Sequence, residues 1–180
     1  MSGPLINALA PIISRLILGR MMTIYDMPGH LIRRLQQISV SVFADRMKTN
    51  GFDLTSPQFA ALAVLEANPG IDQATLAGLI AYDRPTIGGV VDRLVAKGLV
   101  TRKTSTKDRR SKSLTLSEDG AALLSRLRPV VADMQDDILP GLTREERAEF
   151  IRLASKTAAA GNALSRAPLV PIETEATSST

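Results

Sequence analysis

The stretch from Ile71 to Leu116 constrains the fold most strongly, because it reads as two short helices followed by a polar β-hairpin. Asp72 and Asp83 each stand where a side-chain oxygen caps a helix start, and Pro85 falls in the first turn of the second helix. Gly98 is typical of a helix end, since glycine adopts the left-handed cap at little cost. The sequence therefore predicts a helix-turn-helix that leads directly into a hairpin.

The second helix of this pair, expected from Arg84 to Lys97, has one apolar and one polar face. The apolar residues recur at helical spacing: Ile87, Val90, Val91 and Leu94. The opposite face carries Thr86, Gly89 and Arg93. Two β-prone runs follow, Leu99 to Arg102 and Ser113 to Leu116, and a polar, mostly basic loop joins them.

The positive charge of the chain is concentrated in this stretch. Nine Lys and Arg residues and four acids lie between Asp72 and Leu116, a local excess of +5, whereas the whole chain carries +4. A basic loop alone would be an ordinary solvated surface. Here the loop adjoins a helix pair of suitable length, and that combination is typical of proteins that bind duplex DNA.

Composition excludes several other classes of protein. The chain has 180 residues, no cysteine and one histidine, His30, so disulfides, thiolate metal sites and multi-histidine metal sites are not expected. It lacks a phosphate-cradling glycine loop and a nucleophile with a partnered histidine, so we expect no catalysis and no cofactor. No apolar run is long enough to span a bilayer. The pI near 9.8 favours an anionic partner.

The flanking segments read mainly as helices. Residues 1–27 are an apolar arm that packs on a partner subunit, or else the product of a mis-assigned translation start; a signal peptide is disfavoured by Arg15 and Arg20. A long helix is expected from about His30 to Lys48, and Thr55 caps the next. Ser117 caps a helix to about Leu139, with a kink or break at Pro129, and Thr143 with Glu146 begins a last helix ending near Leu164. Residues 165–180 are expected to form a disordered tail.

One arrangement of residues is more specific than these patterns. Asp92-Arg93-Leu94 is followed by Gly98-Leu99-Val100, then by Lys107-Asp108-Arg109-Arg110, and then by Leu114-Thr115-Leu116-Ser117 with Gly120. In order and spacing this resembles the recognition-helix end, wing and wing exit of the MarR family of winged-helix regulators. The resemblance covers about Pro28 to Leu164.

The resemblance implies a mainly α fold with a small β-wing. It assigns residues 28–54 to a first dimerisation helix, 55–117 to a winged helix-turn-helix, and 118–164 to C-terminal dimerisation helices. Members are typically homodimeric, cytoplasmic DNA-binding repressors that leave an inverted-repeat operator when a small aromatic acid binds. The DNA-binding residues expected here are Arg84, Thr86, Gly89, Arg93, Lys107, Asp108, Arg109 and Arg110. Asp108 is expected to orient an arginine of the wing.

A candidate effector site lies at the start of the first long helix. His30 and Arg33 are three residues apart and share one face, with Gln37 one turn further along. A cation and a ring nitrogen suit an organic carboxylate or a phenol. The loose resemblance to relatives that sense aromatic acids extends the candidates to a coenzyme A thioester. The alternative is that these are ordinary surface residues.

Two other functions are consistent with the same sequence. The same fold could serve a DNA-independent helical interaction protein, which a gel shift at physiological salt would distinguish. It could also serve a low-specificity architectural DNA binder, which the ratio of specific to non-specific affinity would distinguish. Membrane binding by the arm is the weakest option.

Overall fold

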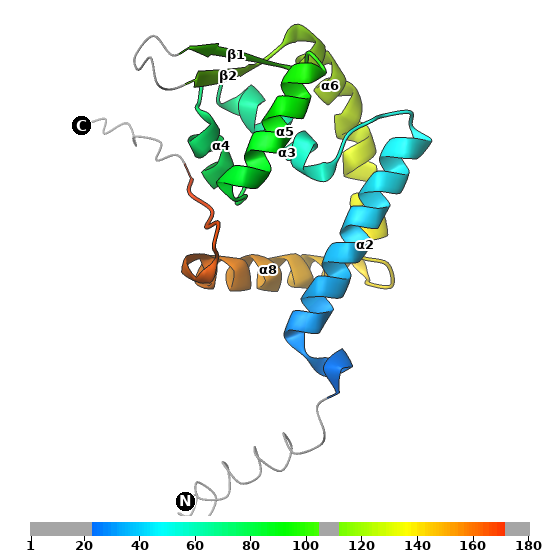
Figure 1. Cartoon of the computed structure of the whole chain (residues 1–180). Coiled ribbons are helices and arrows are strands. Elements are labelled where there is room, and N and C mark those ends of the chain that lie inside the picture. The colour runs from blue at the N-terminus through cyan, green and yellow to red at the C-terminus, as the bar shows by residue number, and fades with distance from the viewer. Residues whose placement is uncertain (1–22, 105–111, 172–180) are drawn as a thin grey trace, which may run out of the picture. The chain divides into compact units, whose positions relative to one another are not determined.

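The computed structural model describes residues 23–104 and 112–171, and the chain divides into two compact units, Met1–Ser41 and Val42–Thr180. The elements in chain order are η1 (Ile24–Asp26), α2 (Pro28–Thr49), α3 (Ser56–Ala67), α4 (Gln73–Leu79), α5 (Arg84–Ala96), β1 (Val100–Thr104), β2 (Lys112–Leu116), α6 (Glu118–Asp133), α7 (Gln135–Ile138), α8 (Arg144–Ala160) and η2 (Asn162–Leu164) (Figure 1). Helix α2 passes from the first unit into the second. This mainly helical architecture with one small antiparallel sheet confirms the expected fold class.

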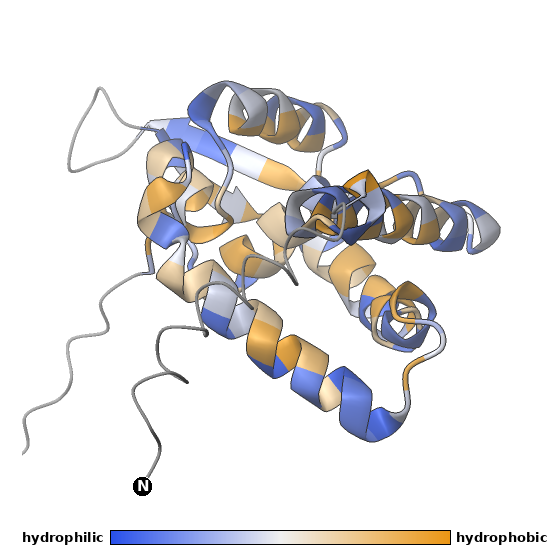
Figure 2. Ribbon diagram, turned by 90° about the horizontal axis from the view of Figure 1, so that it is seen from below, coloured by the Kyte–Doolittle hydropathy of each residue, from blue (hydrophilic) through white to orange (hydrophobic). Residues whose placement is uncertain are grey.

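The core of the second unit is almost entirely aliphatic. It gathers side chains from the C-terminal end of α2 and from α3, α4, α5 and α6, together with the apolar positions of the hairpin. Its fully buried large residues are Met47, Leu62, Leu65, Leu76, Ile87, Leu94, Leu114, Leu124, Leu127 and Val91. In Figure 2, hydrophobic and hydrophilic residues alternate along these helices, as expected where one face packs inward and the other meets solvent.

Local capping chemistry sets the helix starts. The Thr55 N–H donates to Gln58 Oε1 at 2.9 Å, and Gln58 is the one buried polar residue among those described. Thr55 and Gln58 thus form a capping box, and Thr143 and Glu146 form another at the start of α8. The Gly120 N–H donates to Ser117 Oγ at 3.0 Å at the start of α6. These caps satisfy backbone donors that the first turn of a helix leaves unpaired.

Of the kink or break expected at Pro129, the break is wrong, because α6 does not end at this residue. Helix α6 continues through Pro129 to Asp133, and Met134 separates it from α7, which begins at Gln135. Pro129 and Ser125, whose carbonyl the missing N–H would have bonded, are both exposed. Water can therefore solvate that carbonyl, while Leu124 and Leu127 hold the opposite face in the core.

The C-terminal segment also differs from the expectation. Helix α8 ends at Ala160 rather than near Leu164, and the chain then turns through η2. Of the expected disordered tail, residues 165–171 follow a defined path, and the Val170 N–H donates to the Gly78 carbonyl of α4 at 2.9 Å. We call residues 162–171 the C-terminal strap. The remainder of the tail lies outside the described residues.

Candidate nucleic-acid interface

Helix α5 presents a polar outer face. Ile87, Val90, Val91 and Leu94 are buried, as their spacing predicted. The four candidate DNA-binding residues of this helix are exposed to solvent: Arg84, Thr86, Gly89 and Arg93. Because a helix turns by about 100° per residue, burial of one stripe leaves the other stripe free to meet a ligand. In Figure 1, α5 lies beside the hairpin of β1 and β2.

The start of α5 is fixed by Asp83. Its Oδ1 accepts a hydrogen bond from the Thr86 N–H at 2.9 Å, and Pro85 occupies the first turn. The bond from Thr86 lowers the pKa of the Asp83 carboxyl, with a smaller contribution from the positive charge of Arg166. Asp83 therefore stays ionised near neutral pH, and its hydrogen bond fixes the orientation of α5 relative to the preceding turn.

The hairpin is hydrogen-bonded to the segment that precedes α4, through the edge of β2 that faces away from β1. Strands β1 and β2 are antiparallel, with Val100 opposite Leu116 and Thr104 opposite Lys112. On the other edge of β2, the Leu114 N–H donates to the Ile71 carbonyl at 2.8 Å, and the Leu114 carbonyl accepts from the Gly70 N–H at 2.8 Å. The base of the hairpin is thereby built into the turn before α4, so the hairpin and helix pair form one structural unit.

An ion pair that the sequence analysis missed joins α5 to the hairpin. Arg102 Nη2 of β1 lies 2.6 Å from Asp92 Oδ1 of α5. The Arg102 side chain is 25% exposed and the Asp92 side chain 67% exposed. Asp92 is the one acid within the reading helix, and that isolated negative charge was the signal available. The pair takes Arg102 out of the set of cations free to meet DNA.

The tip of the hairpin lies outside the described residues. The four candidates Lys107, Asp108, Arg109 and Arg110 fall in it, so their roles remain predictions. The strands that lead to the tip carry Lys103 and Lys112, both exposed. These two lysines give the described part of the hairpin the positive charge that the sequence analysis assigned to it.

The three candidate effector residues all belong to α2, in the first unit. Arg33 Nη1 donates to Gln37 Oε1 at 2.9 Å, across one turn of α2. The ring of His30 meets the ring of Tyr25 edge to face, with 5.7 Å between the centroids. Tyr25 was not among the sequence candidates. It belongs to η1, whose turn back toward α2 could not be read from periodicity.

The cap of α4 gives a direct test of this local construction. Asp72 Oδ1 accepts from the Thr75 N–H at 2.7 Å, and that bond lowers the pKa of Asp72. We expect Asp72→Ala to lower the free energy of unfolding by about 1 kcal/mol at pH 7, measured by urea denaturation. Asp72→Asn should keep most of the stability that the cap contributes.

The stability difference between the wild type and Asp72→Ala should depend on pH. Because the pKa of Asp72 is lower in the folded chain, its contribution is fully present above the ordinary value of 3.8 and is lost as the pH falls through the folded value. The stability difference between the wild type and Asp72→Ala should therefore shrink below pH 3.8. A difference that stays constant down to pH 2 would contradict the assigned cap.

Comparison with known proteins decides the family. The model of the MarR family matches residues 54–112, which include α3, α4, α5 and β1 and end at the first residue of β2. The HTH-type transcriptional repressor NicR of Pseudomonas putida is 34% identical over 128 residues, covering 71% of this chain and 80% of NicR. The chain belongs to the MarR family of transcriptional regulators.

Solved structures of MarR-family proteins have the same fold. The PcaV transcriptional regulator of Streptomyces coelicolor, in complex with its natural ligand, superposes with a TM-score of 0.69 at 35% identity, over 77% of this chain and 96% of PcaV. BpsR of Bordetella bronchiseptica, whose DNA binding is regulated by 6-hydroxynicotinic acid, superposes with a TM-score of 0.69 at 29% identity, over 74% and 94%. The winged helix-turn-helix fold of this MarR-family chain is therefore shared with these transcriptional regulators.

None of the helices in the described parts of this MarR-family chain combines the length and apolar character needed to cross a membrane.

Proposed function

We propose that the protein is a cytoplasmic, homodimeric repressor that inserts α5 into the major groove of an inverted-repeat operator. Arg84, Thr86 and Gly89 lie nearest the bases, and Arg93 meets the backbone. The hairpin tip reaches the flanking phosphates or minor groove through Lys107, Arg109 and Arg110, while Asp108 orients one of these arginines. The observation that carries the proposal is the exposed polar face of α5 beside a basic hairpin that is hydrogen-bonded to the turn before α4.

Dimer formation is supported by two helices whose apolar residues are exposed in the described part of the chain. Helix α8 has 17 residues and buries none of them, and it exposes Ile151 and Leu153. Within the first unit, Leu31, Ile32 and Ile38 of α2 are also exposed. Isolated helices of this length are marginal in water without packing, so these apolar faces favour a second copy of the chain. The segments concerned belong to the predicted dimerisation regions, 28–54 and 118–164.

The wing assignment is tested by its salt dependence. We expect Arg109→Ala to weaken binding to all DNA sequences and to lower the slope of log affinity against log salt by about 1, because one phosphate contact is lost. Fluorescence anisotropy with labelled duplex at several salt concentrations measures both quantities. Lys48→Ala, which removes an exposed cation from the end of α2, is the matched control. Equal slopes for the two variants would contradict the wing assignment.

The effector site is proposed at His30, Arg33 and Gln37. A guanidinium pre-oriented by Gln37, next to an aromatic pair, suits the carboxylate of a small aromatic acid or its coenzyme A thioester. Regulation of BpsR by 6-hydroxynicotinic acid supports an aromatic acid, and the complex of PcaV with its natural ligand supports a ligand site in this fold. In this proposal the effector releases the repressor from DNA.

A ligand screen tests the effector proposal. Hydroxycinnamic and benzoic acids and their thioesters are added to the wild type and to Arg33→Met, and thermal shift and operator binding are recorded. We expect one of these ligands to raise the Tm of the wild type and release its DNA, and to have a much smaller effect on Arg33→Met. If none of these ligands changes the Tm or the operator binding of the wild type, the proposal that aromatic acids are effectors is wrong.

A further inference from the structure

Hydrogen bonds close the C-terminal strap on itself and attach it to α4. Asn162 Nδ2 donates to the Leu169 carbonyl at 2.9 Å, and the Leu169 N–H donates to Asn162 Oδ1 at 2.8 Å. Further along, the Val170 N–H bonds the Gly78 carbonyl at 2.9 Å. A Cβ at Gly78 would lie 3.2 Å from Val170 Cβ, so the absence of a side chain there allows the close approach. The strap therefore has a defined seat on α4.

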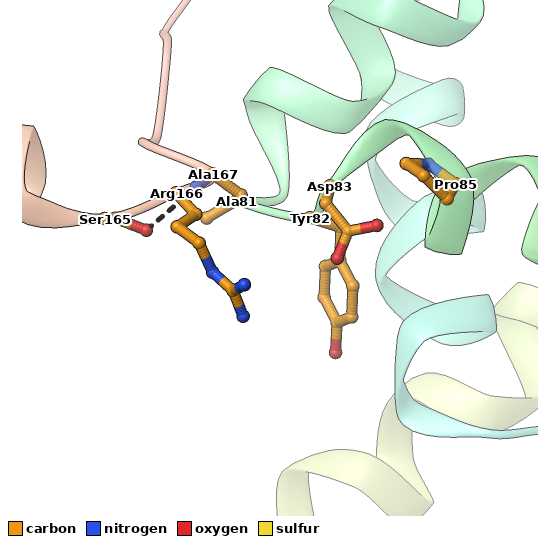
Figure 3. Close-up of a pocket in the computed structure, with 7 residues that line it drawn as sticks. All are labelled: Ala81, Tyr82, Asp83, Pro85, Ser165, Arg166 and Ala167. Carbon is orange, nitrogen blue, oxygen red and sulfur yellow. Dashed lines mark hydrogen bonds between the residues drawn. The ribbon is translucent and has the colours of Figure 1, made fainter.

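This seating places the strap opposite the turn between α4 and α5. A cavity of about 400 Å³ lies between them, lined by Ala81, Tyr82, Asp83, Pro85, Ser165, Arg166 and Ala167. Figure 3 shows the side chains of Arg166 and Tyr82 extending in the same direction from the two walls. The volume is within the range of pockets that hold small organic molecules. None of these residues belongs to the proposed effector site on α2.

The lining has two chemically distinct parts. The rings of Tyr82 and Pro85 and the methyl group of Ala81 form an apolar wall. Arg166 supplies an exposed cation, and no carboxylate of the described residues lies within 4 Å of it. One Asp83 oxygen caps the Thr86 N–H, so the carboxylate is committed to the helix start. The cavity thus offers a guanidinium for an anion, an aromatic ring for stacking, and an acceptor at its edge.

We propose that this cavity is a second ligand site, which takes a small planar acid that bears a hydroxyl group. The carboxylate of the ligand pairs with Arg166, its ring stacks on Tyr82, and its hydroxyl group donates to the Asp83 carboxylate. The site is formed by the C-terminal strap and the turn before the reading helix. It is independent of the proposed site at His30, Arg33 and Gln37.

The test uses 4-hydroxybenzoate as the probe and isothermal titration calorimetry as the readout. In Arg33→Met protein, which lacks the cation of the other site, we expect one ligand bound per chain. Adding Arg166→Met should weaken this binding roughly tenfold or more, since a charge-assisted hydrogen-bond pair is lost. The neutral 4-hydroxybenzamide should bind similarly weakly. Arg166 is exposed, so circular dichroism should show an unchanged fold.

A second variant tests the strap itself. Gly78→Val places a side chain against Val170, so it should displace the strap from α4. The affinity for 4-hydroxybenzoate should fall by a similar factor. Equal affinity of Arg33→Met and Arg33→Met/Arg166→Met would overturn the proposal, as would tight binding of the amide or no binding to Arg33→Met. If only the Arg166 change affects binding by otherwise wild-type protein, the α2 site fails and this one stands.

Discussion

Replacing Gly120 by alanine is expected to lower the free energy of unfolding by about 3 kcal/mol, because the added methyl group has no space. A Cβ at Gly120 would overlap the Leu99 carbonyl oxygen and would lie 2.8 Å from Leu116 Cδ1. The Leu99 carbonyl already accepts the Ser117 N–H, which ties the start of β1 to the exit of the hairpin. The methyl group would therefore push α6 away from the base of the hairpin. Urea denaturation followed by circular dichroism measures the loss.

Gly89→Ala is the matched control for this prediction. Gly89 is also a helical glycine, but a Cβ there would meet nothing within 4 Å. Alanine is favoured over glycine in a helix by roughly 1 kcal/mol, so this variant should be slightly more stable than the wild type. If Gly120→Ala unfolds at the wild-type urea concentration, the close packing at the hairpin exit is wrong.

The largest effect on DNA binding is expected from Gly89→Glu, which should weaken operator affinity about 100-fold or more. The position is exposed at the centre of the proposed reading face, so a carboxylate would be placed against DNA phosphates. Like charges brought together at an interface cost several kcal/mol. Folding should not suffer, since glutamate is a better helix former than glycine. Fluorescence anisotropy and thermal unfolding, measured on the same preparation, separate the two effects.

Gly89→Gln is the control for the charge. Glutamine has nearly the shape of glutamate, so any difference between the two variants reports electrostatics at the DNA surface. We expect the glutamine variant to bind DNA much more tightly than the glutamate variant, with the gap narrowing as salt is raised. Equal affinities for the two would show that this face of α5 does not approach the phosphates.

Local chemistry made much of the fold readable from the sequence. A cap depends on residues three apart, so the caps at Asp72 and Asp83 follow from sequence and are seen in the structure. The buried stripe of α5 also follows, because helical spacing alone determines which residues share a face. The base of the hairpin falls close to the predicted residues, since its strands are bounded by Gly98 and by the cap at Ser117.

Features that depend on distant contacts were not predictable in this way. The strap is held by a bond between Val170 and Gly78, and a composition rich in Pro, Ser and Thr favoured disorder instead. The continuity of α6 through Pro129 depends on which face is exposed and on packing of the opposite face, which propensity does not encode. Each outcome was decided by the three-dimensional surroundings of the residue.

The candidate sites divide along the same line. Exposure of Arg84, Thr86, Gly89 and Arg93 follows from the periodicity of their own helix. The pairing of Arg102 with Asp92 does not, because it joins a strand to the preceding helix across a turn. Opposite charges ten residues apart have no fixed geometry until the hairpin is placed. The cavity at Arg166 was likewise hidden, since its two walls come from segments far apart in the chain.

The most direct test of the central claim is a DNase I footprint on the DNA upstream of the protein's own coding sequence, at physiological salt. If a symmetric dimer reads DNA with its two α5 helices, two protected half-sites in inverted orientation should appear, with centres about one helical turn apart. Gly89→Glu should abolish both together. A lone protected half-site, or protection that Gly89→Glu leaves unchanged, would contradict the account.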